Sequence, residues 1–405
     1  MSSSSGVAPA VLIIGSGMYV CGRHTDGFGT VLPVVLQAQA SGLAGEIVIA
    51  GASSEGVEVL LGKLEKLNDH LGTKCEVRAY PKDGSRDPLA YREALADLPR
   101  PGCAIVAIPD HMHASVTADV IQAGVHPLVV KPLAPTLAEA CRVIELAEIH
   151  NVYGAVEFHK RFDEANLLLR QALANGRLGD LRYITVEFSQ RRGIQKIFQS
   201  WIQHSNVFQY LGVHYVDLIY FVTGAIPVRV LATGQPPTLD TKDLSSLESI
   251  QALVEWKDGN GENSFVSTIV TNWIDPDASS AMSDQKITAV GTLGRYQSDQ
   301  KHRGVQLVTD QYGMEEINPY FTQVYAGATG DIAVHGYGPA SIRQFLTDVR
   351  DLVDGRCELN ELISRRPSFQ EALVSTAVIE GVNRSLSQGG EWISINESSL
   401  KPVRT

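Results

Sequence analysis

Short apolar runs alternate with segments of helical periodicity over residues 11–150, and no other feature limits the possible folds as strongly. The apolar runs are almost continuous, which is typical of parallel strands covered on both faces. They lie at 11–15, 46–51, 103–109 and 126–132. The segments between them have helical spacing and end near Gly or Asn. They lie at 31–42, 57–72, 112–124 and 136–151. This alternation predicts an α/β domain of the Rossmann type with a doubly wound parallel sheet.

Beyond residue 152 the pattern changes to segments that favour antiparallel strands joined by turns. The expected strands lie at 181–190, 227–235, 250–259, 263–273 and 284–299, and the expected helices at 163–176, 207–223 and 339–355. Glycines and an asparagine at 258–261 signal a hairpin. Because 405 residues exceed what one core usually serves, we predict two domains, 1–152 and 153–405. The second is an α+β domain with a large, mostly antiparallel open sheet, and its C-terminal helices are able to pack back on the first.

Composition excludes several classes of partner. The formal net charge of -11 argues against non-specific binding to nucleic acid, which needs a basic surface. No apolar run approaches the roughly 20 residues of a spanning helix, and the first ten residues lack the basic region of a signal peptide. Five scattered cysteines without a CxxC pair indicate a reducing compartment and neither a disulfide framework nor a zinc site. We therefore predict a cytoplasmic protein without a bound metal.

A glycine loop follows the first strand. Gly15, Ser16, Gly17 and Met18 lie where a tight turn lets a pyrophosphate approach the backbone, so we predict that they bind a dinucleotide. The third glycine of the usual pattern is replaced by Val20. Residues 18–29 then delay the first long helix, and they are interpreted as an inserted loop at the cofactor site or as a surface decoration.

The second strand ends without the acidic residue that usually binds the adenosine ribose. Ser53 and Ser54 are the candidates for that role, and Glu55 is an alternative. No arginine follows immediately to hold a 2′-phosphate. The sequence leaves NAD and NADP open as cofactors, with NAD favoured.

Lys131 lies at the carboxyl end of an apolar strand and is followed by Pro132. Side chains at this end of a parallel strand point into the crevice where such sheets bind ligands. The X–Pro bond tolerates a cis form that would give the lysine a fixed direction. The alternative is a lysine that extends to solvent along an apolar surface.

Five motifs occur in one order along the chain, with AIPDHMH the first and YLGVHYVDLIYFVTG the last. They lie at 107–113, 124–134, 156–163, 176–188 and 210–224. Together they resemble the glucose–fructose oxidoreductase, inositol dehydrogenase and rhizopine-catabolism (Gfo/Idh/MocA) family over most of the chain. The resemblance implies an N-terminal Rossmann domain, a C-terminal open-sheet domain and a nicotinamide cofactor between them.

The resemblance also implies catalytic residues. The lysine of the family's Glu-Lys-Pro motif corresponds to Lys131, which would contact the nicotinamide ribose and the substrate. Val130 replaces the glutamate, so we hypothesise that the Lys131 ammonium loses a carboxylate neighbour and deprotonates more easily. The family's Asp-x-x-x-His pair corresponds to Tyr210 and His214, with the aspartate replaced. On a helix these two residues share a face, and a histidine suits proton abstraction near neutral pH. A core aromatic and a core histidine bonded to Asp217 are the structural alternatives.

Further positions correspond to cofactor-binding or substrate-binding segments of the family. Pro109, His113 and Pro132 are expected near the nicotinamide, although His113 alternatively caps the following helix. The expected substrate-binding residues are His159, Arg161, Arg191, Trp201, Asn206 and His335. For Arg161 a structural ion pair is the alternative.

These observations predict a NAD(P)-dependent oxidoreductase that acts on a secondary alcohol of a sugar, cyclitol or glycoside. The nicotinamide accepts the hydride, and His214, helped by Lys131, accepts the proton of the substrate hydroxyl. One alternative is a redox-neutral sugar-processing enzyme that recycles its cofactor. Another is a dinucleotide-binding regulatory protein without turnover. The family resemblance further implies a homo-dimer or homo-tetramer.

Overall fold

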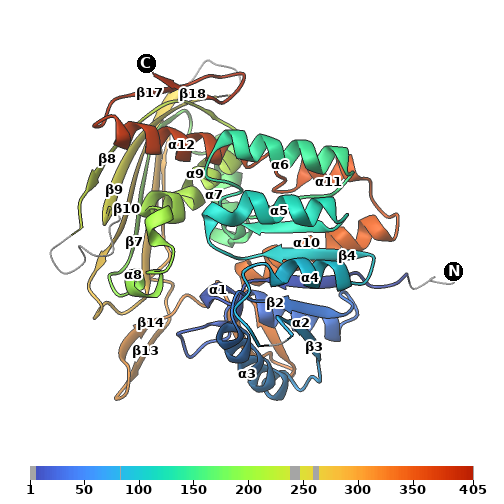
Figure 1. Ribbon diagram of the computed structural model, residues 1–405. Helices are drawn as coiled ribbons and strands as arrows, with labels where there is room; N and C mark the ends of the chain where they lie inside the picture. Colours follow the sequence, from blue (N-terminus) through green and yellow to red (C-terminus); the bar gives the residue numbers. More distant parts are fainter. Residues whose placement is uncertain (1–5, 83, 238–246, 259–263, 405) are drawn as a thin grey trace. The chain divides into compact units, whose positions relative to one another are not determined.

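The computed structural model describes residues 6–82, 84–237, 247–258 and 264–404 (Figure 1). The chain divides into two compact units. Unit 1 consists of Met1–Leu133, Glu139–His159 and Tyr320–Glu371, and unit 2 of Ala134–Ala138, Lys160–Pro319 and Ala372–Thr405. Within the described residues, no helix has both the length and the apolar character that crossing a membrane requires.

Unit 1 is built on a six-stranded parallel sheet with the order β3-β2-β1-β4-β5-β6. The strands are β1 (Ala10–Ile14), β2 (Ile47–Ala50), β3 (Val77–Tyr80), β4 (Gly102–Val106), β5 (His126–Val130) and β6 (Ala155–Glu157). This is the strand order of the Rossmann fold, and it reverses direction between β1 and β4. The predicted doubly wound parallel sheet is therefore confirmed.

The apolar runs of the sequence form the centre of this sheet, because every residue of β1, β2 and β4 is buried. Strands β3 and β6 were not among the predicted strands. Strand β3 carries Arg78 and is only partly buried, as an edge strand can be, and β6 has three residues. Neither strand is long or apolar enough to stand out.

Helices cover the sheet of unit 1, and four of them lie on the predicted segments, whereas the helix at Ala90–Asp97 was not predicted. The helices before β6 are α1 (Met18–Cys21), α2 (Val31–Ala40), α3 (Ser54–Leu71), α4 (Ala90–Asp97), η1 (Asp110–Met112), α5 (His113–Gln122) and α6 (Leu137–Ile149). The segment 18–29, expected as a loop, begins with the helical turn α1. That turn ends at Gly22, whose φ of 71° is left-handed and favours glycine.

Residues 320–371 complete unit 1 with the hairpin β15 (Gln323–Ala326) and β16 (Ile332–His335) and with helices α10 (Tyr337–Val353) and α11 (Leu359–Arg365). Helix α10 packs against α2. Ile342, Phe345 and Val349 of α10 belong to the same buried apolar cluster as Val34 and Val35 of α2. The core of unit 1 thus combines residues from both ends of the chain.

Unit 2 contains an eight-stranded sheet with the order β12-β11-β7-β10-β9-β8-β17-β18. Its strands are β7 (Leu181–Arg191), β8 (Ile226–Gln235), β9 (Ser249–Lys257), β10 (Ser264–Asp275), β11 (Ser283–Gly291), β12 (Arg295–Asp299), β17 (Ile393–Ile395) and β18 (Pro402–Arg404). The predicted large, mostly antiparallel sheet is confirmed with one correction. Strands β7 and β10, both expected in antiparallel pairs, run parallel to each other. They are not joined by a hairpin, since the chain passes through β8 and β9 between them.

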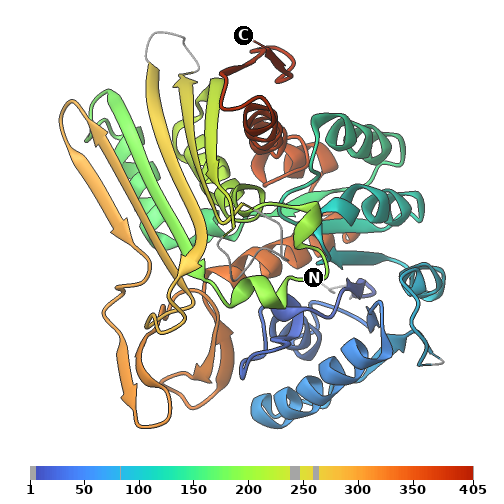
Figure 2. The ribbon, with the colours of Figure 1, turned by 60° about the vertical axis from the view of Figure 1, so that its left-hand side comes forward.

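The hairpin predicted at 258–261 joins β9 and β10, which pair antiparallel. Its residues 259–261 lie outside the described part of the chain. Helices pack on one another and on this sheet, with α12 against β8 and α9, and with α7 against α9 (Figure 2). The helices are η2 (His159–Phe162), α7 (Glu164–Ala174), α8 (Ile194–Ile197), η3 (Ile202–His204), η4 (Phe208–Gly212), α9 (Val213–Thr223) and α12 (Leu373–Ser387). A separate hairpin is formed by β13 (Gln306–Thr309) and β14 (Gly313–Glu316).

Candidate functional site

The glycine loop after β1 leaves backbone exposed at the point where the strand order of the sheet reverses. Gly15 has a φ of 121°, and a Cβ atom there would lie 2.2 Å from the Ala107 carbonyl oxygen. Only glycine fits at this position. A Cβ atom on Gly17 would meet nothing within 4 Å, so the backbone beside it is open. Ser16, Gly17 and Met18 can therefore accept a pyrophosphate in the crevice between the ends of β1 and β4.

Polar side chains gather beside this loop at the start of α3. The Ser53 hydroxyl accepts a hydrogen bond from the Gly56 amide at 3.3 Å and caps the helix, and Ser54 is its first residue. Arg23, from the loop after α1, donates to Glu55 at 2.8 Å. A Cβ atom on Gly56 would lie 2.5 Å from the Ser16 hydroxyl oxygen and 3.1 Å from the Arg23 guanidinium. Arg23 was not among the predicted site residues, because nothing in the sequence links its loop to α3.

Lys131 lies directly after β5, and the Lys131–Pro132 peptide bond is cis. Lys131 is partly buried. Burial lowers the pKa of Lys131 to about 8, against the opposing effect of the Asp110 and Glu157 carboxylates, which raise it. The effect of replacing the family's glutamate with Val130 stays a prediction, because burial and these two carboxylates act on Lys131 whatever residue stands at position 130. Lys131 has two carboxylate neighbours, and burial accounts for the low value.

His113 and Pro132 connect the loops that follow β4 and β5. His113 is 1% exposed, and its Nδ1 and Nε2 atoms lie 2.6 Å from the Pro132 carbonyl oxygen and 2.9 Å from the Ile108 carbonyl oxygen. The ring thus fixes the backbone beside Lys131. Pro109 immediately precedes the helical turn η1, which carries Asp110.

A buried carboxylate that the sequence analysis did not identify lies next to Lys131. Glu157 ends β6, is 1% exposed and places Oε2 2.9 Å from Nδ1 of His159. The His159 ring stacks on Tyr19 and Tyr337, with ring centroids 6.2 Å and 5.7 Å apart. Burial and the Glu157 carboxylate raise the pKa of Tyr19 well above its usual value. His159, predicted to bind substrate, is therefore packed among aromatic rings and held by Glu157.

In unit 2, His214 is 6% exposed near the start of α9, with its ring 6.1 Å from the Phe188 ring. Tyr210 lies in the π-helical turn η4 that precedes α9. The expected spacing of a regular α-helix between the two residues is therefore interrupted. The Tyr210 ring packs against Phe198 at 5.0 Å and Trp201 at 5.6 Å, so both Tyr210 and Trp201 belong to an aromatic cluster.

The remaining predicted substrate residues of unit 2 have structural partners. Asn206 accepts a hydrogen bond from the Gln209 amide at 2.9 Å and donates one to Asn383 at 2.7 Å. Arg191 donates a hydrogen bond to the carbonyl oxygen of Ser279. Arg161 donates to both carboxylate oxygens of Asp217, at 2.9 Å and 2.6 Å, which is the ion pair that the sequence analysis gave as the alternative.

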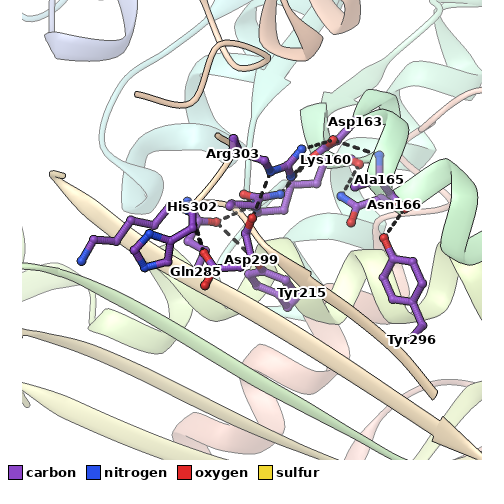
Figure 3. A network of polar contacts seen from close by, with 12 residues as sticks. Lys160, Asp163, Ala165, Asn166, Tyr215, Gln285, Tyr296, Asp299, His302 and Arg303 are labelled. Atoms are coloured by element: carbon purple, nitrogen blue, oxygen red, sulfur yellow. Dashed lines mark hydrogen bonds and ion pairs between the residues drawn. The ribbon is translucent and has the colours of Figure 1, made fainter. Parts of the chain in front are cut away.

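Lys160, between His159 and Arg161, is the centre of a buried polar network (Figure 3). Its ammonium donates to Gln285 at 2.5 Å and Gln300 at 2.9 Å and lies 4.7 Å from the centre of the Tyr215 ring. Gln300 in turn donates to Asp163 at 2.8 Å. The network ties β11 and the segment after β12 to the start of α7. This network was not predictable from the sequence, because its members are far apart along the chain.

In unit 1, His335 at the end of β16 stacks on Tyr325 with ring centroids 4.3 Å apart. Its Nε2 atom is buried and has no hydrogen-bond partner among the described residues. In the part of the chain that the structure describes, no group of three or more His, Cys, Asp or Glu side chains is placed to hold a metal ion.

Two family models match this chain. Residues 52–158 match an oxidoreductase family with a NAD-binding Rossmann fold (GFO_IDH_MocA), and residues 167–297 match the GFO/IDH/MocA C-terminal domain. Among curated proteins, inositol 2-dehydrogenase from Leifsonia xyli is 28% identical over 44% of this chain and 50% of its own length. Myo-inositol dehydrogenase Hyg17 from Streptomyces leeuwenhoekii is 29% identical over 41% of this chain and 51% of its own length. The chain thus spans about half the length of these relatives.

Solved structures are similar over almost the whole chain. Myo-inositol 2-dehydrogenase from Lactobacillus plantarum has a TM-score of 0.65 at 16% identity, covering 96% of this chain and 100% of that chain. Scyllo-inositol dehydrogenase from Lactobacillus casei, with bound NAD(H) and scyllo-inositol, has a TM-score of 0.63 at 14% identity, covering 95% and 99%. At these identities the similarity establishes the fold.

Proposed function

The chain belongs to the Gfo/Idh/MocA family of oxidoreductases, and we propose on this basis that it transfers hydride between a nicotinamide cofactor and a secondary alcohol of a cyclitol or sugar. The supporting observation is Lys131, a partly buried lysine with a pKa of about 8 at the carboxyl edge of a Rossmann sheet. A lysine in this state can gain or lose a proton near neutral pH. The names of the relatives, inositol dehydrogenases among them, support the substrate class.

Unit 1 has the NAD-binding Rossmann fold of the family, and its glycine loop suits a dinucleotide. Ser16, Gly17 and Met18 would hold the pyrophosphate, and Ser53 and Ser54 would hold the adenosine ribose. When bound, the cofactor accepts the hydride from the carbinol carbon. The protein supplies the binding groups and the acid–base groups.

Removal of the hydroxyl proton falls to this chain's own side chains. In the proposed reaction the O–H bond breaks as the C–H bond does, and the proton passes to Lys131 or His214. Neutral Lys131 can accept it, and protonated Lys131 stabilises the developing alkoxide charge. Tyr210, inside its aromatic cluster, is assigned a supporting role only.

A dehydrogenase screen tests the proposal. The protein is incubated with NAD or NADP and with inositols, sugars and glycosides between pH 7 and 10, and absorbance at the reduced nicotinamide band is followed together with product analysis. Accumulation of NADH or NADPH with the matching ketone supports hydride transfer. Product without net cofactor reduction indicates the redox-neutral reaction. Tight nucleotide binding without any product indicates a regulatory protein and overturns the proposal.

Cofactor choice is expected to depend on Glu55. This carboxylate lies at the start of α3 and forms an ion pair with Arg23. The Arg23 guanidinium is therefore not available to bind a 2′-phosphate, and the negative charge of Glu55 also repels that phosphate. We expect the wild type to prefer NADH over NADPH. Replacing Glu55 with Gln should tighten NADPH binding about tenfold, roughly 1.4 kcal/mol, and leave NADH binding unchanged.

Fluorescence titration with each reduced nucleotide measures both dissociation constants. Glu58→Gln is the matched control, because Glu58 is an exposed carboxylate one turn further along the same helix. The control should bind both nucleotides as the wild type does. A NADPH affinity that does not respond to Glu55→Gln would contradict this account of cofactor choice.

A further inference from the structure

Val130 occupies the place of the glutamate in the family's motif, and a buried carboxylate lies opposite it on the neighbouring strand. In the parallel pair of β5 and β6, Val130 is the register partner of Glu157. Register partners in a parallel pair project to the same face of the sheet as neighbours. A side chain at position 130 and the Glu157 side chain therefore occupy adjacent places on one face of the sheet, and the Glu157 carboxylate is close enough to Lys131 to raise the pKa of its ammonium.

Glu157 is not a surface carboxylate that happens to lie near a lysine. It is 1% exposed, and a buried carboxylate is costly unless charged or hydrogen-bonding partners compensate it. One partner is His159, at 2.9 Å. Tyr19 and Lys131 also interact with Glu157, whose carboxylate raises the pKa of both side chains, while burial lowers the pKa of Lys131.

We propose that Glu157 is the positioning residue for Lys131, supplying from β6 the carboxylate that Val130 does not supply from β5. This inference rests on the proposed role of Lys131 in proton transfer. In this arrangement Glu157 keeps the Lys131 ammonium directed into the crevice. It also keeps a larger fraction of Lys131 protonated than would be protonated without the Glu157 carboxylate. His159 holds the carboxylate in place from its other side.

The environment of this pair is defined by several elements of unit 1. The titratable groups that face Lys131 and Glu157 are Asp110 of η1, His113 of α5, His159 of η2, Tyr19 of α1 and Tyr337 of α10. Asp110 is the second carboxylate that acts on Lys131. It remains in every variant below, so differences between them report on Glu157.

The test measures the protonation of Lys131 without cofactor or substrate. The rate at which an amine-reactive reagent acylates Lys131 is followed by peptide mass spectrometry across pH, because only the neutral amine reacts. In Glu157→Gln the midpoint should move to lower pH by on the order of one unit. The double variant Val130→Glu, Glu157→Gln restores a carboxylate on β5, and its midpoint should return toward the wild-type value. Glu145→Gln, which removes an exposed carboxylate of α6, should change nothing.

The same variants are assayed for turnover. The limb of the pH–rate profile that reports Lys131 should move to lower pH in Glu157→Gln and return in the double variant. A purely structural role for Glu157 would reduce stability without moving either the midpoint or the limb. If Glu157→Gln does not fold, the double variant tests the inference instead. A double variant that folds and has the wild-type labelling midpoint supports the inference, and one that lacks either the fold or that midpoint overturns it.

An unchanged labelling midpoint in Glu157→Gln would also overturn the inference. Because the labelling needs no nucleotide, that result would leave the proposed function intact. Conversely, a wild type that turns over no alcohol would refute the proposed function while the labelling still reported on Glu157. The two failures are therefore distinguishable.

Discussion

Replacing Lys131 with Met is expected to lower turnover about 10³-fold while leaving the protein folded and able to bind NADH. The lysine lies at the end of β5, beside the crevice edge of the sheet, and its low pKa results from burial. Methionine fills a similar volume but can neither accept a proton nor stabilise an alkoxide. Since the glycine loop contributes the nucleotide contacts, the loss should appear in kcat and not in the dissociation constant for NADH.

Lys131→Arg separates charge from proton transfer. A guanidinium remains protonated at all accessible pH values, so this variant keeps the positive charge beside Glu157 but cannot take a proton from the substrate. We expect it to be nearly as inactive as Lys131→Met. Retained activity in the arginine variant would assign Lys131 a purely electrostatic role.

The matched control is Lys82→Met. Lys82 is an exposed lysine of unit 1 that pairs with Glu93 and Asp97 at 3.0 Å and 2.8 Å. Exposed pairs of this kind contribute little, so turnover and NADH binding should both match the wild type. If Lys131→Met kept most of the wild-type turnover, Lys131 would not be the catalytic lysine.

The sheet of unit 1 was predictable because its central strands are buried on both faces and are therefore almost continuously apolar. Strand β6 was not, since it has only three residues. That omission also concealed Glu157. A sequence motif identifies Lys131 through its neighbours in the chain, but the Glu157 carboxylate is its neighbour only through strand pairing. Pairing across strands cannot be read from one sequence without the tertiary fold.

The helix that carries His214 shows a second limit. The four-residue spacing between Tyr210 and His214 predicts one helical face, yet the chain forms a π-helical turn at η4. Tyr210 in this turn also contacts Phe198 and Trp201 of a different segment. Local spacing identified both residues but not the backbone geometry that joins them.

Breaking the buried ion pair between Arg161 and Asp217 is expected to have the largest effect on the stability of unit 2. Both oxygens of Asp217 accept from Arg161, and the two side chains are 6% and 1% exposed. Arg161→Met would leave the carboxylate buried without its cation, which typically costs about 3–5 kcal/mol of unfolding free energy. The double variant Arg161→Met, Asp217→Leu should recover most of this loss, because two apolar side chains then pack where the two charged side chains did.

Arg229 and Glu255 provide a closely matched control. This pair is also bidentate, with both distances 2.7 Å, and each arginine also lies over an aromatic ring, Trp392 for Arg229 and Phe221 for Arg161. The main difference is exposure, since the side chains of Arg229 and Glu255 are 39% and 30% exposed. Water screens such a pair, so Arg229→Met should cost less than about 1 kcal/mol.

Urea unfolding monitored by tryptophan fluorescence measures both effects in the intact chain. All four tryptophans, Trp201, Trp256, Trp273 and Trp392, belong to unit 2, so the signal reports that unit directly. A large midpoint shift for Arg161→Met and a small one for Arg229→Met would identify burial as the cause. Equal shifts would mean that the shared bidentate geometry determines the stability. A loss of substrate affinity in Arg161→Met without any loss of stability would instead assign the guanidinium to the substrate, as the sequence first suggested.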